Sequence, residues 1–382
     1  MNHHYTAGII GKTGRGDYGH SLDRAFEEFP QVTVAAVADE NPDALNAAIE
    51  RTGAERAYND FREMLEKEEL DLVAVGPRWA NCHADEVIAA AAAGVKGIIC
   101  EKPMAATLAQ ADAMIEACER NGTRMVVAHR RACAYEQHAK DMVDEGVIGP
   151  IQTMRAHGKA DTRSGSMDLA VLGTHMMDSM RYFAGSEVAW AHGHVTQDGR
   201  AIAKADIYEE AEGVGLVAGN GVTAYYAFEN GITAHYDSYA GDRPGSRWFG
   251  FEIYGLNGIL SLRNSPAGEM YHYPHGLWIP GEDDGHWERI LLEDWERRPD
   301  GQLRTDHEKT LLSNRMIVEE LLEAIEQDRE IVRCSSGRDA RAVLEMIMAV
   351  HASQRAGARV MLPLENRENP YETWATEGEV SG

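Results

Sequence analysis

The sequence has little positive charge. Its 382 residues include 37 lysines and arginines against 62 aspartates and glutamates, which gives a formal net charge of -25 at neutral pH. A chain this acidic repels nucleic-acid backbones and anionic lipid surfaces. We therefore expect no nucleic-acid or membrane partner, and we expect a small-molecule ligand instead.

Paired cysteines and long hydrophobic runs are also lacking. Five cysteines are scattered without a CxxC pair, namely Cys82, Cys100, Cys118, Cys133 and Cys334. This pattern is typical of buried, reduced thiols in a cytoplasmic protein. There is no run of 18 apolar residues, and the first residues lack the layout of a secretory signal. His192 and His194 share one face of a predicted strand, but no carboxylates or thiols cluster near them, so we expect no metal site.

The composition, with 44% hydrophobic and 26% charged residues, is that of a globular protein long enough for two domains. The first part alternates short apolar runs with amphipathic helical segments, a pattern that predicts a parallel sheet with crossover helices. The predicted strands are residues 7–10, 32–38, 70–75, 97–100 and 125–128, and the predicted helices are residues 21–29, 42–52, 60–67, 81–93 and 108–121.

The pattern changes after residue 150. Residues 223–228 and 232–239 flank Asn230-Gly231, which predicts an antiparallel hairpin, and residues 250–254 and 258–263 form a second strand pair. Helices return at 311–327 and 339–354. We predict an α/β chain with a doubly wound parallel domain over 1–130, an α+β domain with a large, mainly antiparallel open sheet over 131–364, and a polar tail over 365–382. The helix at about 338–355 is expected to pack back on the first domain.

A glycine-rich turn follows the first predicted strand. It reads Gly11, Lys12, Thr13, Gly14, Arg15, Gly16, with Thr13 where the second glycine of GxGxxG is expected and Gly14 one place later. Backbone amides at a strand-to-helix turn can hold a pyrophosphate. A helix is expected to open at about Tyr18. A glycine-rich surface turn would look much the same, so this motif alone is weak.

Asp39 ends the second predicted strand, roughly 20 residues beyond the turn. A carboxylate there accepts hydrogen bonds from the adenosine ribose hydroxyls and repels a 2′-phosphate, which predicts a Rossmann domain that binds NAD rather than NADP. Removal of Asp39 is then expected to weaken NAD more than NADP. The alternative is that Asp39 only caps the helix that starts near Pro42.

Several further motifs follow in order. Glu101-Lys102-Pro103 comes directly after the predicted strand 97–100, Pro77 and His83 follow the strand before it, and Gly173-Thr174-His175 precedes Asp178. Together with the glycine turn, Asp39 and residues 251–255, they make the chain resemble the glucose-fructose oxidoreductase and inositol dehydrogenase family (Gfo/Idh/MocA) over almost its whole length.

This resemblance implies NAD as cofactor, a sheet that commonly forms homodimer or homotetramer contacts, and a site that includes Pro77 and Glu101, with the glutamate near the nicotinamide ribose. It also implies that Lys102 contacts substrate and cofactor. The position of Lys102 supports this independently, since an ammonium at a strand end can stabilise alkoxide character at a substrate hydroxyl. The alternative is a lysine that only extends along the surface past Pro103.

His175 is by resemblance the general acid or base for the hydroxyl proton, a role that suits an imidazole at neutral pH. Many members of the family have an aspartate four residues earlier, where this sequence has Val171. Either Asp168 reaches the site, or Lys102 and His175 act without a carboxylate. Asp178, one turn after His175, could orient the imidazole or be an ordinary helix carboxylate.

His129-Arg130-Arg131 follow the predicted strand 125–128. They are candidates for contacts with cofactor phosphates or an anionic substrate group, and interdomain salt bridges are the alternative.

The residues point to an NAD-dependent oxidoreductase acting on a ring hydroxyl of a sugar, cyclitol or glycoside. A second hypothesis is a glycosidase with tightly bound NAD that transiently oxidises C3 and eliminates the aglycone, with an anionic sugar such as a sulfonated or uronic glycoside as one candidate substrate. A non-catalytic dinucleotide-binding protein is a third, since fold does not fix function.

Overall fold

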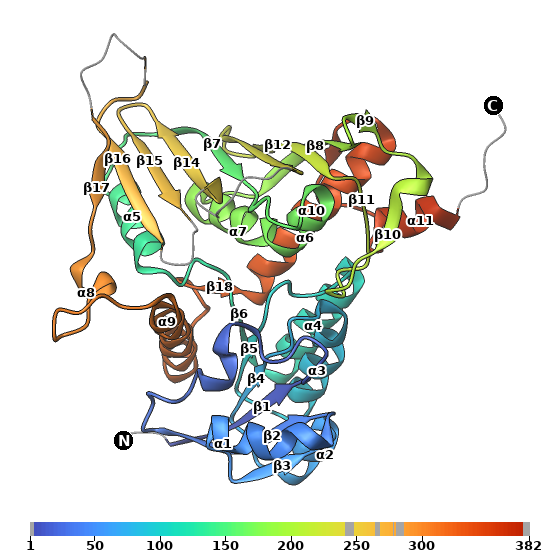
Figure 1. Cartoon of the computed structure of the whole chain (residues 1–382), viewed down its shortest axis with the longest axis vertical. Coiled ribbons are helices and arrows are strands. Elements are labelled where there is room, and N and C mark those ends of the chain that lie inside the picture. Colours follow the sequence, from blue (N-terminus) through green and yellow to red (C-terminus); the bar gives the residue numbers. More distant parts are fainter. Residues whose placement is uncertain (1–3, 241–247, 264–267, 278, 280–285, 377–382) are drawn as a thin grey trace. The chain divides into compact units, whose positions relative to one another are not determined.

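A computed structural model describes residues 4–240, 248–263, 268–277, 279 and 286–376 (Figure 1). Its contacts divide the chain into two compact units. The first consists of Met1–Ala132, Ala211–Val214 and Thr310–Arg341, and the second of Cys133–Glu210, Gly215–Lys309 and Ala342–Gly382. In the described residues, no helix has the length and apolar character needed to cross a bilayer.

The first unit is built on a twisted sheet in the order β18-β6-β5-β4-β1-β2-β3, in which every pair is parallel except β18 with β6. The strands are β1 Tyr5–Gly11, β2 Val32–Asp39, β3 Arg56–Tyr58, β4 Leu72–Val75, β5 Gly97–Cys100, β6 Arg124–Val127 and β18 Ser335–Ser336. Strands β4 and β5 are completely buried, which explains why they are continuous apolar runs. The predicted doubly wound sheet is confirmed.

Crossover helices connect these strands. They are α1 Leu45–Thr52, α2 Phe61–Lys67, α3 Ala80–Ala92 and α4 Leu108–Asn121, with a short 3₁₀ turn η2 at Pro42–Ala44. The sequence marks their ends: Thr107 caps α4 by accepting a hydrogen bond from the Gln110 N–H, and Gly122 ends it with a φ of 69°. Helices α3 and α4 pack side by side (Figure 1).

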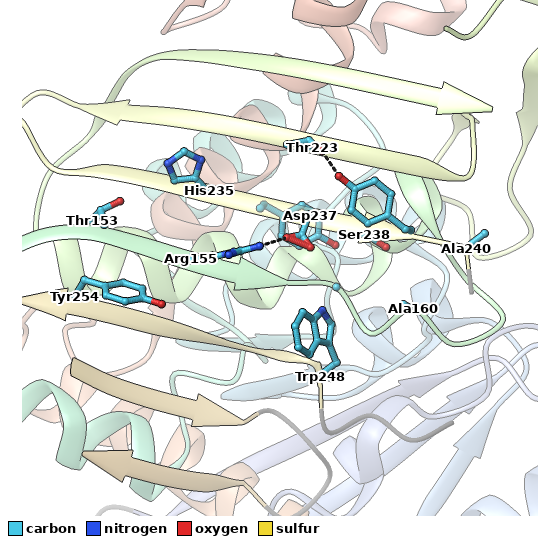
Figure 2. Close-up of a pocket in the computed structure, with 13 residues that line it drawn as sticks. Thr153, Arg155, Ala160, Thr223, His235, Asp237, Ser238, Ala240, Trp248 and Tyr254 are labelled. Carbon is cyan, nitrogen blue, oxygen red and sulfur yellow. Dashed lines mark hydrogen bonds and ion pairs between the residues drawn. The ribbon is translucent and has the colours of Figure 1, made fainter. Parts of the chain in front are cut away.

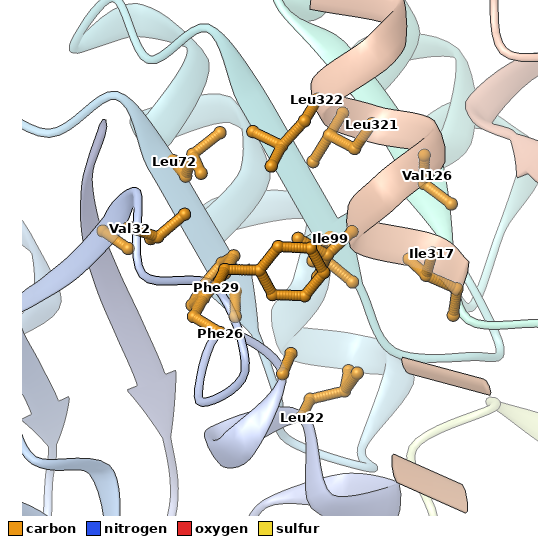
Figure 3. Packing of buried hydrophobic residues seen from close by; sticks show 14 of the residues in the cluster. Leu22, Phe26, Phe29, Val32, Leu72, Ile99, Val126, Ile317, Leu321 and Leu322 are labelled. Carbon is orange, nitrogen blue, oxygen red and sulfur yellow. The ribbon is translucent and has the colours of Figure 1, made fainter. Parts of the chain in front are cut away.

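One face of this sheet is covered by α9, Asp306–Glu326, a helix from late in the chain. Its apolar residues Ile317, Leu321 and Leu322 point toward Ile99 and Leu72 of the sheet (Figure 3). Leu22, Phe26 and Phe29, from the segment after β1, complete this core (Figure 3). Residues 310–341 therefore belong with the first unit, whereas the sequence-based division placed them in the second domain. An amphipathic face shows that a helix is covered but does not identify what covers it.

The second unit contains a mainly antiparallel sheet in the order β17-β16-β15-β14-β7-β13-β12-β8-β19, with β9 paired to β8. Only β7 and β13 run parallel. The strands are β7 Ile151–His157, β8 Val188–Gln197, β9 Arg200–Ala201, β12 Gly221–Phe228, β13 Thr233–Tyr239, β14 Gly250–Gly255, β15 Ile259–Arg263, β16 Glu269–Tyr273, β17 Glu288–Ile290 and β19 Val360–Met361. Both predicted hairpins, β12–β13 and β14–β15, are present. A separate ribbon pairs β10 Ile207–Glu209 with β11 Leu216–Ala218.

The helices of this unit are α5 Ala134–Asp144, α6 Gly165–Val171, α7 Gly173–Ala184, α8 Glu293–Glu296, α10 Gly337–Ala356 and α11 Pro370–Thr376, with a 3₁₀ turn η3 at Lys204–Asp206. Side chains alternate across each strand. Met154 and Ala156 of β7 and Tyr236 of β13 are buried, and α6 and α7 contact these strands. The intervening residues, such as Arg155 and His235, lie on the other face, which we call the open face.

Helix α10, predicted at about 338–355, is divided between the two units. Only residues 337–341 belong to the first unit. Further along, Val350 packs so closely on Gly193 of β8 that a Cβ there would lie 2.6 Å from its Cγ1, and the Met346 carbonyl accepts a hydrogen bond from the Tyr226 hydroxyl of β12. The helix follows β8 because Gly193 lets the two backbones approach.

The segment predicted as a polar tail is described up to Thr376 and includes α11. Tyr371 of α11 is completely buried and stacks on the His351 ring at a centroid distance of 4.5 Å. The Asn369 side chain donates to the Leu216 carbonyl at 2.9 Å. A few apolar and hydrogen-bonding residues within a polar stretch are enough to hold it against the second unit.

Candidate active site in the first unit

The predicted site residues of the first unit meet at one edge of its sheet. Strands β1, β2, β4, β5 and β6 are parallel, so their carboxyl ends share this edge. The strand order reverses beside β1, where β2 lies on one side and β4 on the other. Open α/β sheets bind ligands at such a switch point. The residues found there are Gly11 at the end of β1, Asp39 at the end of β2, Pro77 after β4, Glu101 and Lys102 after β5, and His129 after β6.

The glycine turn is a small hairpin. The Lys12 and Asp17 backbones exchange hydrogen bonds of 3.2 and 2.9 Å, and the Arg15 N–H donates to the Lys12 carbonyl. Gly14 has a φ of 82° and open space where a side chain would be, and Gly16 has a φ of 97°. The prediction began its glycine pattern at Gly11 and thereby missed an intact GxGxxG over Gly14, Gly16 and Gly19. The spacing in the sequence alone could have revealed it.

No α-helix opens at Tyr18, contrary to expectation. The turn leads instead into a 3₁₀ segment, η1 Gly19–Arg24, in which His20 and Ser21 have left-handed conformations with φ of 44° and 60°. Two consecutive non-glycine residues in this region are strained. Asn314 of α9 donates to both of their carbonyls, at 2.9 and 3.1 Å. The strained turn is therefore held by a residue far away in the sequence, which local patterns could not show.

Asp39 is 1% exposed, and its carboxylate is surrounded by donors. It accepts hydrogen bonds from the Thr13 N–H at 3.1 Å and hydroxyl at 2.7 Å, from the Tyr18 hydroxyl at 2.9 Å and from the Asn41 N–H at 3.0 Å. The Tyr18 ring also lies against Gly11, where a Cβ would come within 2.1 Å of it. Asp39 therefore fastens the glycine turn to the end of β2, and its bond to Asn41 fits the capping alternative in part.

Two basic side chains of the turn have their own partners. The Lys12 Nζ lies 2.8 Å from the Glu40 carboxylate and 3.4 Å from that of Glu86, a fully buried residue of α3. The Arg15 guanidinium lies over the Trp79 ring, 5.1 Å from its centroid. Both residues connect the turn to segments on either side of it.

Glu101 is fully buried and forms an ion pair with His20, a residue that the sequence-based prediction missed. Gly19 allows this approach, because a Cβ there would lie 2.6 Å from the Glu101 Oε1. Burial raises the pKa of Glu101, but the charges of His20 and Lys102 outweigh it and leave that pKa below its usual range. The Glu101 Oε2 is buried without a hydrogen-bond partner. A buried orphan acceptor of this kind suits a bound ligand that donates to it.

Lys102 is 4% exposed and is followed by Pro103. His83 of α3 holds the two neighbouring loops together, with Nε2 2.6 Å from the Pro77 carbonyl and Nδ1 3.0 Å from the Pro103 carbonyl. The loop after β4 and the loop that follows Lys102 are thereby tied to one buried side chain.

The basic cluster after β6 is engaged within the first unit. The His129 Nδ1 lies 3.0 Å from the Ser335 hydroxyl, and the buried Arg131 forms an ion pair with Asp339 at 3.3 Å. Arg130 is half-buried. For Arg131 the structure favours the salt-bridge alternative, although the pair lies within one unit.

The remaining candidates belong to the second unit. His175 and Asp178 are buried on α7, and the His175 ring meets Phe249 edge-on at a centroid distance of 6.4 Å. Val171, the residue in place of the family aspartate, is completely buried in α6.

Asp168 lies on α6 beneath the sheet. Its Oδ2 accepts hydrogen bonds from the Ser238 hydroxyl at 2.5 Å and the Ala160 N–H at 3.1 Å, while Oδ1 is buried without a hydrogen-bond partner. Burial raises its pKa to about 6 despite these two donors. Gly158 leaves the space that the carboxylate fills, because a Cβ there would lie 2.1 Å from Oδ2.

A cavity of about 610 Å³ lies on the open face of the second unit's sheet (Figure 2). Its lining is polar and aromatic and comprises Thr153, Arg155, Gly158, Ala160, Thr223, His235, Tyr236, Asp237, Ser238, Tyr239, Ala240, Trp248 and Tyr254. None of the predicted site residues lines it. The described part of the chain contains no group of three or more His, Cys, Asp or Glu side chains able to hold a metal ion.

Comparison with known proteins shows which family has these two units and this strand-end site. Residues 5–129 match the model of an oxidoreductase family with an NAD-binding Rossmann fold, GFO_IDH_MocA, and residues 137–261 match the GFO/IDH/MocA C-terminal domain. The chain belongs to the GFO/IDH/MocA oxidoreductase family. The strand-end site and the orphan oxygen of Glu101 fit its cofactor, NAD.

Individual relatives agree with this assignment. Levoglucosan dehydrogenase from Pseudarthrobacter phenanthrenivorans is 26% identical over 339 residues, which cover 74% of this chain and 86% of that protein. Myo-inositol 2-dehydrogenase from Thermotoga maritima is 30% identical over 200 residues, which cover 50% of this chain and 59% of that protein. A solved levoglucosan dehydrogenase, in complex with NADH and levoglucosan, shares the fold with a TM-score of 0.73 at 22% identity, covering 94% of this chain and 100% of that one.

Proposed function

We propose that this family member is an NAD-dependent dehydrogenase that oxidises a ring hydroxyl of a sugar, cyclitol or glycoside. The observation that carries the proposal is the placement of Lys102, buried beside the ionised Glu101 at the carboxyl end of β5, in a domain that matches the NAD-binding family model. The substrate class rests on relatives that are levoglucosan and inositol dehydrogenases.

In this proposal the cofactor site consists of Gly11, Lys12, Thr13, Gly14, Arg15 and Gly16, together with Asp39, Pro77, Glu101 and Lys102. When bound, NAD supplies the hydride acceptor. Lys102 donates a hydrogen bond to the substrate hydroxyl and stabilises negative charge on its oxygen as the carbon is oxidised. His175 accepts the hydroxyl proton, so a hydride and a proton leave together and a ketone forms.

Val171 bears on the proton transfer. An apolar, buried side chain there cannot accept a hydrogen bond from the lysine or the imidazole. Asp168 is already bonded to Ser238 and Ala160, so we propose that Lys102 and His175 act without a carboxylate from either position.

The experiment is a spectrophotometric screen. Purified protein is mixed with NAD and a panel of anhydrosugars, inositols, aldoses and glycosides, and the appearance of NADH is followed by its absorbance. At least one compound should give turnover that Lys102→Ala abolishes. Absence of NADH across the panel, in protein shown to bind NAD, would contradict a dehydrogenase.

The glycosidase hypothesis predicts a different result in the same screen. Chromogenic glycosides would release their aglycone without accumulation of NADH, from protein that retains NAD through purification. Release of aglycone together with a silent dehydrogenase assay would replace the main proposal.

We also propose that two or four copies assemble through the open face of the second unit's sheet. Arg155, Asp237 and Trp248 line its cavity and offer charged and aromatic contacts (Figure 2). Light scattering should give a dimer or tetramer mass, and Trp248→Glu should shift it toward the monomer.

A further inference from the structure

Two neighbouring carboxylates at the end of β2 differ in what they can contact. Asp39 is 1% exposed, whereas the Glu40 side chain is 53% exposed. A carboxylate in this position normally distinguishes NAD from NADP, because it accepts hydrogen bonds from ribose hydroxyls and repels a 2′-phosphate. Either residue could serve by sequence alone.

Asp39 is already committed to the protein. Its two oxygens accept hydrogen bonds from four donors, namely the Thr13 N–H and hydroxyl, the Tyr18 hydroxyl and the Asn41 N–H. A ribose that bonded this carboxylate would have to displace Thr13 or Tyr18. Displacing either would detach the glycine turn from β2, so the contacts of Asp39 are those of a positioning residue.

Glu40 is accessible and held in place. The Lys12 Nζ lies 2.8 Å from its Oε1, so the carboxylate is oriented by the glycine turn itself. Since Lys12 directly follows Gly11, Glu40 lies beside the turn and the end of β1.

The charge of Lys12 is not available to an incoming phosphate. Its ammonium also lies 3.4 Å from the fully buried Glu86. Burial raises the pKa of Glu86, so this carboxyl needs a cation to remain ionised. When all three groups are ionised, one ammonium serves two carboxylates, so the cluster carries a net negative charge, and Glu40 is its accessible carboxylate.

We propose that Glu40, oriented by Lys12 and with Glu86 behind it, is the residue that rejects a 2′-phosphate and makes the protein prefer NAD, while Asp39 positions the glycine turn. This inference rests on the proposed function only in requiring that the first unit binds the dinucleotide. It gives to Glu40 the role that the sequence analysis expected of Asp39.

The experiment measures binding, and no substrate is needed. NADH and NADPH are titrated into the full-length protein, and their fluorescence gives both dissociation constants. Glu40→Gln should tighten NADPH about tenfold, because one repulsive charge is removed, and should change NADH by less than about threefold. Glu63→Gln is the matched control: Glu63 is 47% exposed and pairs with Lys67, so it repeats the ion pair away from the strand ends.

Asp39→Asn completes the test. It should weaken NADH and NADPH by the same factor, and hence leave their ratio unchanged, because it loosens the turn that serves both. The inference would be overturned if Asp39→Asn changed the ratio of the NADH and NADPH dissociation constants while Glu40→Gln left that ratio unchanged. If Asp39→Asn fails to fold, Glu40→Gln decides alone, since its side chain is exposed. Failure of the wild-type protein to bind either nucleotide would instead overturn the proposed function and the inference with it.

Discussion

Glu101 in the first unit and Asp168 in the second are both carboxylates without solvent exposure, yet their pKa values move in opposite directions. Burial raises both. Around Glu101 the charges of His20 and Lys102 prevail, and its pKa is lowered. Around Asp168 two neutral donors, Ser238 and Ala160, are not enough, and its pKa rises to about 6.

Burial alone therefore does not decide whether a carboxyl group is ionised. Hydrogen bonds from neutral groups reduce the free-energy cost of burying a carboxylate. A nearby cation is needed to bring the pKa of the buried carboxyl below its usual value. The region around Glu101 therefore holds an anion beside a cation, as a catalytic site requires. The carboxyl of Asp168, in contrast, is easily protonated.

The largest expected effect is on kcat and comes from removing the ammonium group of Lys102. Lys102→Ala should lower kcat about 1000-fold, within the range for loss of a group that handles a proton in the transition state. Once a substrate is known, steady-state kinetics measure this. Lys96→Ala, which removes an exposed lysine paired with Asp71 at 2.7 Å, is the control and should leave kcat within about twofold. Similar losses in both variants would contradict a specific role for Lys102.

The next largest effect is on the pH dependence of the free energy of unfolding, through Asp168. The unfolded Asp168 ionises near its ordinary pKa of 3.8, but the folded one keeps its proton up to about pH 6. The contribution of Asp168 to the free energy of unfolding should therefore fall as pH rises through this interval, by about 3 kcal/mol in all. Urea unfolding at several pH values measures this.

Asp168→Asn should remove that part of the pH dependence, because an amide oxygen can still accept from Ser238 and carries no titrating proton. Asp43→Asn, an exposed substitution, should leave the profile unchanged. A wild-type profile that coincides with that of Asp168→Asn would show that the carboxyl is ionised in the folded protein.

The smallest expected effect comes from removing the charge of His20 beside Glu101. His20→Gln keeps a donor but removes the charge, so the pKa of Glu101 should rise. The acidic limb of kcat/KM against pH should then move upward by about one unit, with about a tenfold loss at low pH. His4→Gln alters an exposed histidine bonded to Thr33 and is the control. An unmoved acidic limb would mean that the charge of His20 does not support Glu101.

Sequence patterns predicted the parts of the molecule that depend on local periodicity. The buried runs of β4 and β5, the hairpin at Asn230-Gly231 and the placement of Lys102 at a strand end all follow from short stretches of chain. What could not be predicted depends on distant partners. Nothing near His20 indicates that Asn314 holds its strained backbone, and nothing near Asp39 shows that Tyr18 folds over it.

The covering of the parallel sheet by α9 has a consequence for how the protein is made. During translation strands β1 to β6 of the first unit emerge long before Ile317 and Leu321, which bury one face of that sheet. A nascent chain ending near residue 132 would leave this apolar surface in water, where it invites aggregation or chaperone binding. A truncated nucleotide-binding fragment should accordingly be insoluble unless residues 310–341 are supplied, whether fused or as a separate peptide.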